Sequence, residues 1–121
     1  MKRIVALVIM VSTSATPGVA SSSSVTVKLY ATVAAGHTIT FKAATANGSV
    51  PVARLQAGRY TVVVRDHSNS DNFHLFGQGV DKRTSRLFVG RQQWAVALRK
   101  GTYTFRSDAR PLKTKRTFRV L

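Results

Sequence analysis

The sequence predicts an all-β fold, a sandwich or barrel of about seven or eight short strands in one domain. Three observations support this prediction. Apolar residues alternate with polar ones at a period of two through most of the chain. Turn residues such as Asn47-Gly48 and Lys100-Gly101 separate the alternating runs. No segment after residue 24 has the periodicity of a convincing helix, and a length of 121 residues leaves room for a single domain.

The expected strands follow from the alternating runs in chain order. These runs occupy residues 25–30, 38–42, 59–65, 94–99, 103–105 and 118–120, with shorter apolar patches at Leu55 and at 87–89. One face of each run is expected to point inward. Together these faces predict a two-layer core of Val27, Ile39, Phe41, Tyr60, Val62, Val64, Phe73, Leu75, Trp94, Val96, Leu98, Tyr103, Phe105, Phe118 and Val120.

The first twenty residues have the organisation of a secretory signal peptide. A short basic start precedes an apolar run at residues 4–11, and a segment of small residues ends in Gly18-Val19-Ala20. Eight apolar residues are too few for a membrane-spanning helix, and no later stretch approaches that length. We therefore expect a signal peptide at 1–20, a flexible leader at 21–24, and a secreted, extracytoplasmic domain at 25–121 without a transmembrane segment.

The composition excludes several kinds of site. The chain has no cysteine, and its four acidic residues are all Asp. Disulfides, thiolate zinc sites, iron–sulfur clusters and cysteine nucleophiles are therefore ruled out, and a glycosidase carboxylate pair or a calcium site is disfavoured. The 19 Lys and Arg give a formal net charge of +15. A content of 44% hydrophobic residues nevertheless distinguishes the chain from a disordered polycation.

Two segments carry a more specific pattern. One is AGRYTVVVRD at 57–66, followed by Asn72-Phe73-His74-Leu75 and GQGVDK at 77–82; the other is WAVALRKGTYTF at 94–105, followed by TFRV at 117–120. In order and spacing, the chain from Gly36 to Leu121 resembles the small secreted cupredoxins, the family of plastocyanin and azurin. The resemblance implies a Greek-key β-sandwich with a copper site between the loops at one end.

The resemblance also implies where the four copper ligands would fall, and this chain has none of them. In the family the first ligand is a His directly before the Asn, where this chain has Asp71. The Cys, second His and Met of the last hairpin would fall at Ser107, Arg110 and Thr114. A blue-copper centre needs a thiolate and two imidazoles, and arginine stays protonated and cannot coordinate. We therefore expect no type I copper site and no cofactor.

The same positions suggest what replaces a metal. Asp71 and Arg110 would converge in such a fold, so we predict a charge-assisted pair to which the inward-facing Ser107 hydrogen-bonds; the alternative is that both side chains are solvated. A weak zinc or copper(II) site of His67, Asp71 and His74 is conceivable, but histidines bonded to water or backbone are the commoner case. His37, in a turn after Gly36, carries no signal.

The charge gives the clearest indication of function. No arrangement of nucleophile and base and no phosphate-binding glycine loop supports an enzyme. Near the C-terminus, the candidate anion-binding residues are Arg110, Lys113, Lys115 and Arg116. We expect a binding or structural module for an anionic polymer or cell-surface component, without specific nucleic-acid recognition because the aromatic residues point inward. The alternatives are a copper-binding or electron-transfer protein with a non-standard site at His67 or His74, an immunoglobulin-like adhesion module, and a basic protein whose charge only aids solubility.

Overall fold

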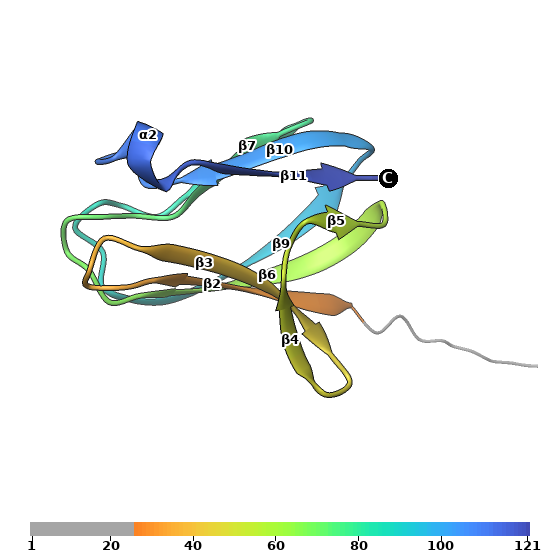
Figure 1. The fold of residues 1–121 in the computed structure, drawn as a ribbon, viewed down its shortest axis with the longest axis horizontal. Helices are drawn as coiled ribbons and strands as arrows, with labels where there is room; N and C mark the ends of the chain where they lie inside the picture. Colours follow the sequence, from red (N-terminus) through yellow and green to blue (C-terminus); the bar gives the residue numbers. More distant parts are fainter. Residues whose placement is uncertain (1–25) are drawn as a thin grey trace, which may run out of the picture.

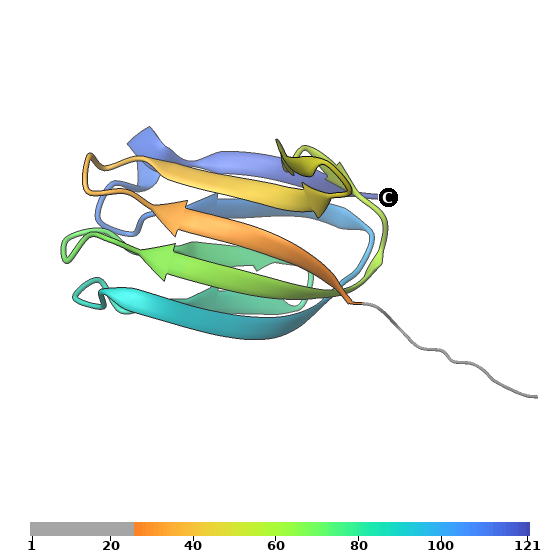
Figure 2. The ribbon, with the colours of Figure 1, turned by 90° about the horizontal axis from the view of Figure 1, so that it is seen from below.

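The fold is a sandwich of two five-stranded sheets, seen as two layers in Figure 1 and from below in Figure 2. The computed structural model describes residues 26–121. The signal peptide expected at 1–20, the leader at 21–24 and the first domain residue, 25, lie outside the described residues. Within residues 26–121, no helix is long and apolar enough to cross a membrane.

The first sheet has the strand order β4-β3-β2-β6-β9. Its strands are β2 (Val27–Val33), β3 (Ile39–Thr45), β4 (Gly48–Pro51), β6 (Gly58–Asp66) and β9 (Gly90–Leu98). The pair β2–β6 is parallel, and the other neighbours are antiparallel. Strands β3, β2 and β6 therefore have a hydrogen-bonded neighbour on each side, whereas β4 and β9 are the edges of this sheet.

The second sheet has the order β5-β11-β10-β7-β8. Its strands are β5 (Arg54–Leu55), β7 (His74–Gly77), β8 (Val80–Arg83), β10 (Gly101–Arg106) and β11 (Arg116–Val120), and a one-turn helix, α2 (Pro111–Thr114), lies between β10 and β11. Only the short β11–β5 pair is parallel. Strands β3 and β11 belong to different sheets and face each other along one side of the sandwich, which is turned toward the viewer in Figure 1.

The predicted core is confirmed at most positions and wrong at Val27. Of the predicted residues, Ile39 and Trp94 are partly buried against the core and Val27 is 44% exposed. The register explains why Val27 is exposed. Strand β3 begins to pair with β2 only at Leu29, which lies opposite Ala43, so Val27 lies beyond the end of this pairing. The buried face of β2 consists instead of Leu29, Ala31 and Val33, and Val63 is buried on the other face of the central strand β6.

The structure has more and shorter elements than the sequence pattern indicated. Residues 26–121 form ten strands instead of seven or eight, because β4, β5 and β8 have only two to four residues. An alternation cannot be read over so short a length. The expectation of no helix is wrong for α2, a single turn with a proline in its first turn. The apolar patch 87–89 is a connection between β8 and β9, and Leu87 is exposed.

Four connections meet at one end of the sandwich, the end at which α2 lies in Figure 1. They are residues 34–38, 67–73, 84–89 and 107–115. The register shows why they meet, because Val33, Asp66 and Gly90 lie side by side at the corresponding end of the first sheet. Arg106, His74 and Arg83 do the same in the second sheet. We call this the loop end.

Candidate functional site

A buried carboxylate organises the loop end. The Asp71 side chain is almost completely buried in the connection from β6 to β7. Its Oδ1 accepts hydrogen bonds from Ser107 Oγ and from Arg110 Nη1, each at 2.8 Å. Its Oδ2 accepts one from His37 Nδ1 at 2.6 Å. The ion pair predicted between Asp71 and Arg110, with Ser107 bonded to it, is therefore confirmed.

Thr114 completes this arrangement from the helix α2. Its Oγ1 accepts a hydrogen bond from the Ser107 backbone N–H at 2.8 Å and donates one to the Arg110 carbonyl at 2.7 Å. The structure thus brings together all four positions at which the sequence resemblance would place copper ligands. That these positions descend from a copper site stays a prediction.

The side chains gathered here do not fit a type I copper ion. They offer one carboxylate, two hydroxyls and a guanidinium, with no thiolate or thioether and with only His37 as an imidazole at the edge. Arg110 and Ser107 together already donate to the lone pairs of Asp71 Oδ1 that a metal would need. We call this assembly of His37, Asp71, Ser107, Arg110 and Thr114 the Asp71 network.

The electrostatics of the network favour an ionised Asp71. Burial on its own raises the pKa of the Asp71 carboxyl. Hydrogen bonds from His37, Ser107 and Arg110, together with the positive charge of Arg110, outweigh burial and hold this pKa below its ordinary value. The carboxylate is therefore a permanent acceptor at neutral pH and ties three separate connections together.

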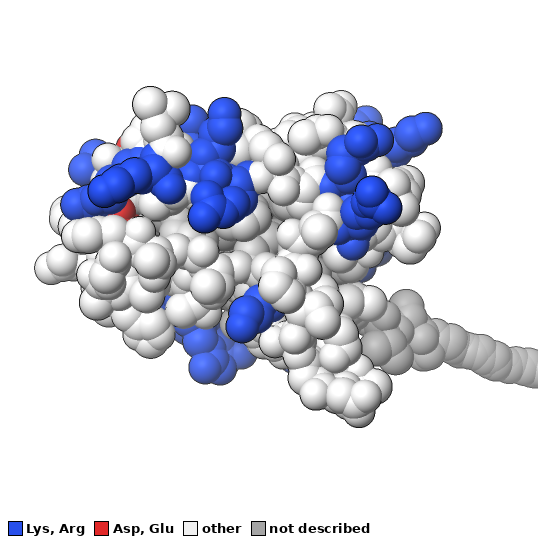
Figure 3. All heavy atoms as spheres, in the orientation of Figure 1, with Lys and Arg blue, Asp and Glu red and all other residues white. Residues whose placement is uncertain are grey.

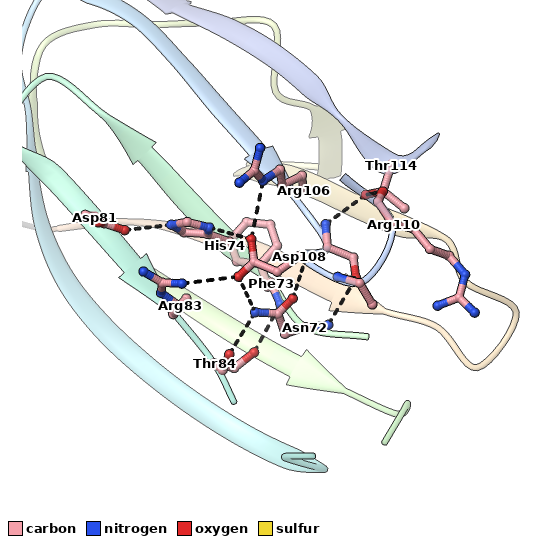
Figure 4. Close-up of polar contacts among 12 residues, drawn as sticks. Asn72, Phe73, His74, Asp81, Arg83, Thr84, Arg106, Asp108, Arg110 and Thr114 are labelled. Carbon is pink, nitrogen blue, oxygen red and sulfur yellow. Dashed lines mark hydrogen bonds and ion pairs between the residues drawn. The ribbon is translucent and has the colours of Figure 1, made fainter. Parts of the chain in front are cut away.

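A second polar network lies beside the first, around His74 and Asp108 (Figure 4). His74 Nδ1 lies 2.8 Å from Asp108 Oδ1, and its Nε2 lies 2.6 Å from Asp81 Oδ1. Asn72 accepts a hydrogen bond from the Asp108 backbone N–H at 2.7 Å and donates to Asp108 Oδ2 at 3.1 Å. Burial raises the pKa of Asp108, but hydrogen bonds from His74 and Asn72 bring it below its ordinary value.

The histidines lie where the sequence did not place them. His74 contacts Asp81 and Asp108, Asp71 contacts His37, and His67 is exposed. The conceivable site of His67, Asp71 and His74 is therefore not assembled, and within residues 26–121 no three potential ligand side chains gather closely enough to hold a metal. His37, which carried no sequence signal, is a full member of the Asp71 network. Its backbone φ of 65° is in the left-handed region, which suits its place in the turn.

One buried carboxylate has an unsatisfied oxygen. Asp66 accepts a hydrogen bond from the Ser68 backbone N–H through Oδ1, at 2.8 Å. Its buried Oδ2 has no hydrogen-bond partner among the described residues. Burial raises the pKa of this carboxyl, and the negative charge of Asp71 adds to that effect. Asp66 therefore responds to pH in the opposite sense to Asp71.

The acidic residues are concentrated at the loop end, and the basic residues cover the surface. Asp66 and Asp71 are buried, the side chain of Asp108 is 18% exposed, and only that of Asp81, at 64%, is well exposed. Only three arginines of residues 26–121 lie within ion-pair distance of an Asp, namely Arg83, Arg106 and Arg110. Figure 3 shows Lys and Arg side chains gathered over the end that carries α2 and over the end at which β11 finishes.

The four predicted anion-binding residues differ in their surroundings. Arg110 is engaged with Asp71, and only a third of its side chain is exposed. Lys113, Lys115 and Arg116 are exposed and have no carboxylate partner among the described residues. The surface available to an anion near α2 is thus made by these three residues rather than by all four.

Comparison with solved structures agrees with the architecture. Reduced rusticyanin is 15% identical to this chain with a TM-score of 0.58, covering 83% of this chain and 82% of its own. A single-site variant of rusticyanin is also 15% identical, with a TM-score of 0.57 and coverage of 82% and 80%. No protein-family model and no curated protein matches the chain. The fold is therefore cupredoxin-like, in place of the immunoglobulin-like alternative.

Proposed function

We propose that this cupredoxin-like chain is a secreted binding module for anionic polymers or surfaces, neither an enzyme nor an electron carrier. The observation that supports the binding role is the distribution of charge. Three of the four Asp side chains are buried or mostly buried at the loop end. The many exposed Lys and Arg therefore meet almost no carboxylate on the surface, and their positive potential extends into solvent.

The state of the loop end supports the second half of the proposal. Asp71 and Arg110 form an ion pair at the place where the resemblance would put two copper ligands. A hydroxyl, Ser107, stands where it would put the thiolate. The loop end then serves to hold the connections in place, while the basic surface performs the binding.

Binding to heparin tests the polyanion role. The chain from residue 25 onward is expected to bind immobilised heparin at low salt and to release it steeply as salt is added, because each contact displaces a condensed counterion. Neutralising Lys113, Lys115 and Arg116 together with Gln should lower the slope of log affinity against log salt by about 2 to 3. The matched control neutralises Arg59, Arg65 and Arg91, three exposed arginines of the opposite sheet.

The heparin experiment has two outcomes that overturn parts of the proposal. Failure of the wild-type protein to bind at low salt would remove the polyanion role altogether. Equal slopes for the two triple variants would show that the positive charge acts evenly over the surface and that the residues near α2 have no special part.

Copper titration tests the proposed loss of electron transfer. With Arg110 bound to Asp71 and no thiolate in the chain, copper(II) added in excess is expected to be removed by desalting and to give no thiolate charge-transfer band. The measurement is the metal content after desalting, followed by absorption spectroscopy. Retention of one copper per chain, abolished by replacing His67 or His74 with Gln, would favour the non-standard copper site instead.

A further inference from the structure

The sandwich is open along part of the side where β3 faces β11. Strand β4 pairs with β3 only from Lys42 onward, and β5 pairs with β11 only at Arg119 and Val120. Residues 39–40 and 116–118 therefore have no covering strand on this side, and Phe41 is covered only by Val52, whose backbone N–H donates to the Phe41 carbonyl at 3.0 Å. A hollow of about 230 Å³ lies there, and it reaches the two core rings Phe41 and Phe105.

The floor of this hollow is apolar. Phe41 and Phe105 are almost completely buried, and the partly buried Ile39 and Val52 pack against the same core cluster. Pro51 adds a further apolar wall. At about 230 Å³ the hollow is large enough to take a short alkyl chain. Filling it with an apolar chain would remove exposed apolar surface from water.

An arginine lies at the mouth of the hollow in a position that a core residue would normally take. Arg116 is opposite Phe105 in the register of β10 and β11. Side chains alternate along a strand, so Arg116 shares the inward-facing side of β11 with the buried Phe118 and Val120. Its guanidinium donates a hydrogen bond to the neighbouring Lys115 carbonyl at 3.0 Å, and it forms no ion pair with any residue of 26–121.

The remaining charge around the hollow is also positive. Lys42 lines it from the β3 side. A smaller neighbouring hollow of about 140 Å³ shares Ile39 and Arg116 with it and adds Lys113 and His37. In the part of the chain that the structure describes, no acidic residue lines either hollow. In the orientation of Figure 1, Figure 3 shows Lys and Arg side chains on both sides of the uncharged surface between β11 and β3.

We infer that this hollow, the seam site, binds a single-tailed amphiphilic anion, with its tail on the apolar floor and its head group at Arg116. An exposed guanidinium at the mouth of an apolar hollow, with no acidic partner among residues 26–121, is matched by a carboxylate or a phosphate, because both accept charge-assisted hydrogen bonds. The apolar floor suits a short alkyl tail. The site is separate from the surface lysines that hold a polymer in the proposed function, although Arg116 belongs to both.

The test measures binding of octanoate, octyl phosphate and octanol by NMR titration of the ¹⁵N-labelled domain. Octanoate or octyl phosphate should shift the amide signals of residues 39–42, 51–52 and 116–117, and octanol should bind at least tenfold more weakly. The two anions together distinguish a carboxylate head group from a phosphate. Arg116→Gln should remove the preference for the anions, and Arg116→Lys should retain part of it.

Two further variants separate the seam site from the general basic charge. Arg119→Gln removes the same charge from an outward-facing, exposed position of the same strand, and it should leave octanoate binding unchanged. Ile39→Trp should fill the hollow and abolish octanoate binding while heparin binding persists. Equal affinity for octanoate and octanol, equal loss in Arg116→Gln and Arg119→Gln, or absence of binding by all three compounds would overturn the inference. Loss of heparin binding alone would overturn only the proposed function.

Discussion

Replacement of Asp71 with Asn is expected to lower the free energy of unfolding by about 2–3 kcal/mol. The change keeps the volume of the side chain but removes the charge that holds Arg110 and His37 at 2.8 and 2.6 Å. Ser107 keeps at most a neutral acceptor at this buried position. The cost stays below that of a fully buried ion pair because the side chains of Arg110 and His37 are 33% and 46% exposed and can turn to water.

Urea denaturation at pH 7 measures this effect, and Asp81→Asn is its control. Asp81 also pairs with a histidine, at 2.6 Å, but its side chain is 64% exposed. Removing an exposed partner of this kind should cost less than about 1 kcal/mol. The double variant Asp71→Asn with Arg110→Gln should lose clearly less than the sum of the two single losses. Additive losses, or equal losses for the Asp71 and Asp81 variants, would contradict a central role for the Asp71 network.

Acidification is expected to destabilise the protein as the pH falls through about 4, the ordinary range of Asp, and below. The pKa values of Asp71 and Asp108 are held below the ordinary value in the folded state. The unfolded chain therefore binds more protons in this range, and stability falls as protons are added. Above the ordinary pKa both carboxylates are ionised in either state, so their contribution is fully present at neutral pH.

Asp66 opposes this trend and provides an internal control. Its pKa is raised in the folded state, so its contribution is fully present below the unfolded pKa and is lost as the pH rises through the folded one. Asp66→Asn should therefore make the acid loss steeper, whereas Asp71→Asn should make it shallower. The measurement is the urea midpoint of the three proteins between pH 7 and pH 2.5. The same pH dependence of the midpoint in all three proteins would show that neither Asp66 nor Asp71 is coupled to protonation.

The main features of the fold could be predicted because the period of two identifies the long strands. The pairing of Asp71 with Arg110 spans 39 residues and could be expected only because the resemblance to the cupredoxins places both positions at one end of the sandwich. His37 could not be predicted, because its partner lies 34 residues away and no motif joins them. His74 could not be assigned either, since Asp81 and Asp108 approach it from a neighbouring strand and from a loop.

Arg116 shows where the alternation of side chains along a strand stops predicting burial. The pattern of β11 identifies Phe118 and Val120 as buried, and it would continue inward to Arg116. Whether this last inward position is closed or open depends on how far β4 and β5 extend across the side of the sandwich. Those strands are too short to be recognised from the sequence. The seam site therefore became visible only in three dimensions.

The Asp71 network also bears on the order in which the chain assembles. Its hydrogen bonds join Asp71 to residues 34, 36 and 39 positions away, in different connections. Contacts over such separations close larger loops than hairpins such as β7–β8 and β10–β11, so we expect them to form later than those hairpins. Bonds made after the folding barrier act mainly on the rate of unfolding. We therefore expect the Asp71 network to slow unfolding, in a chain that has no cysteine and so no disulfide to do the same.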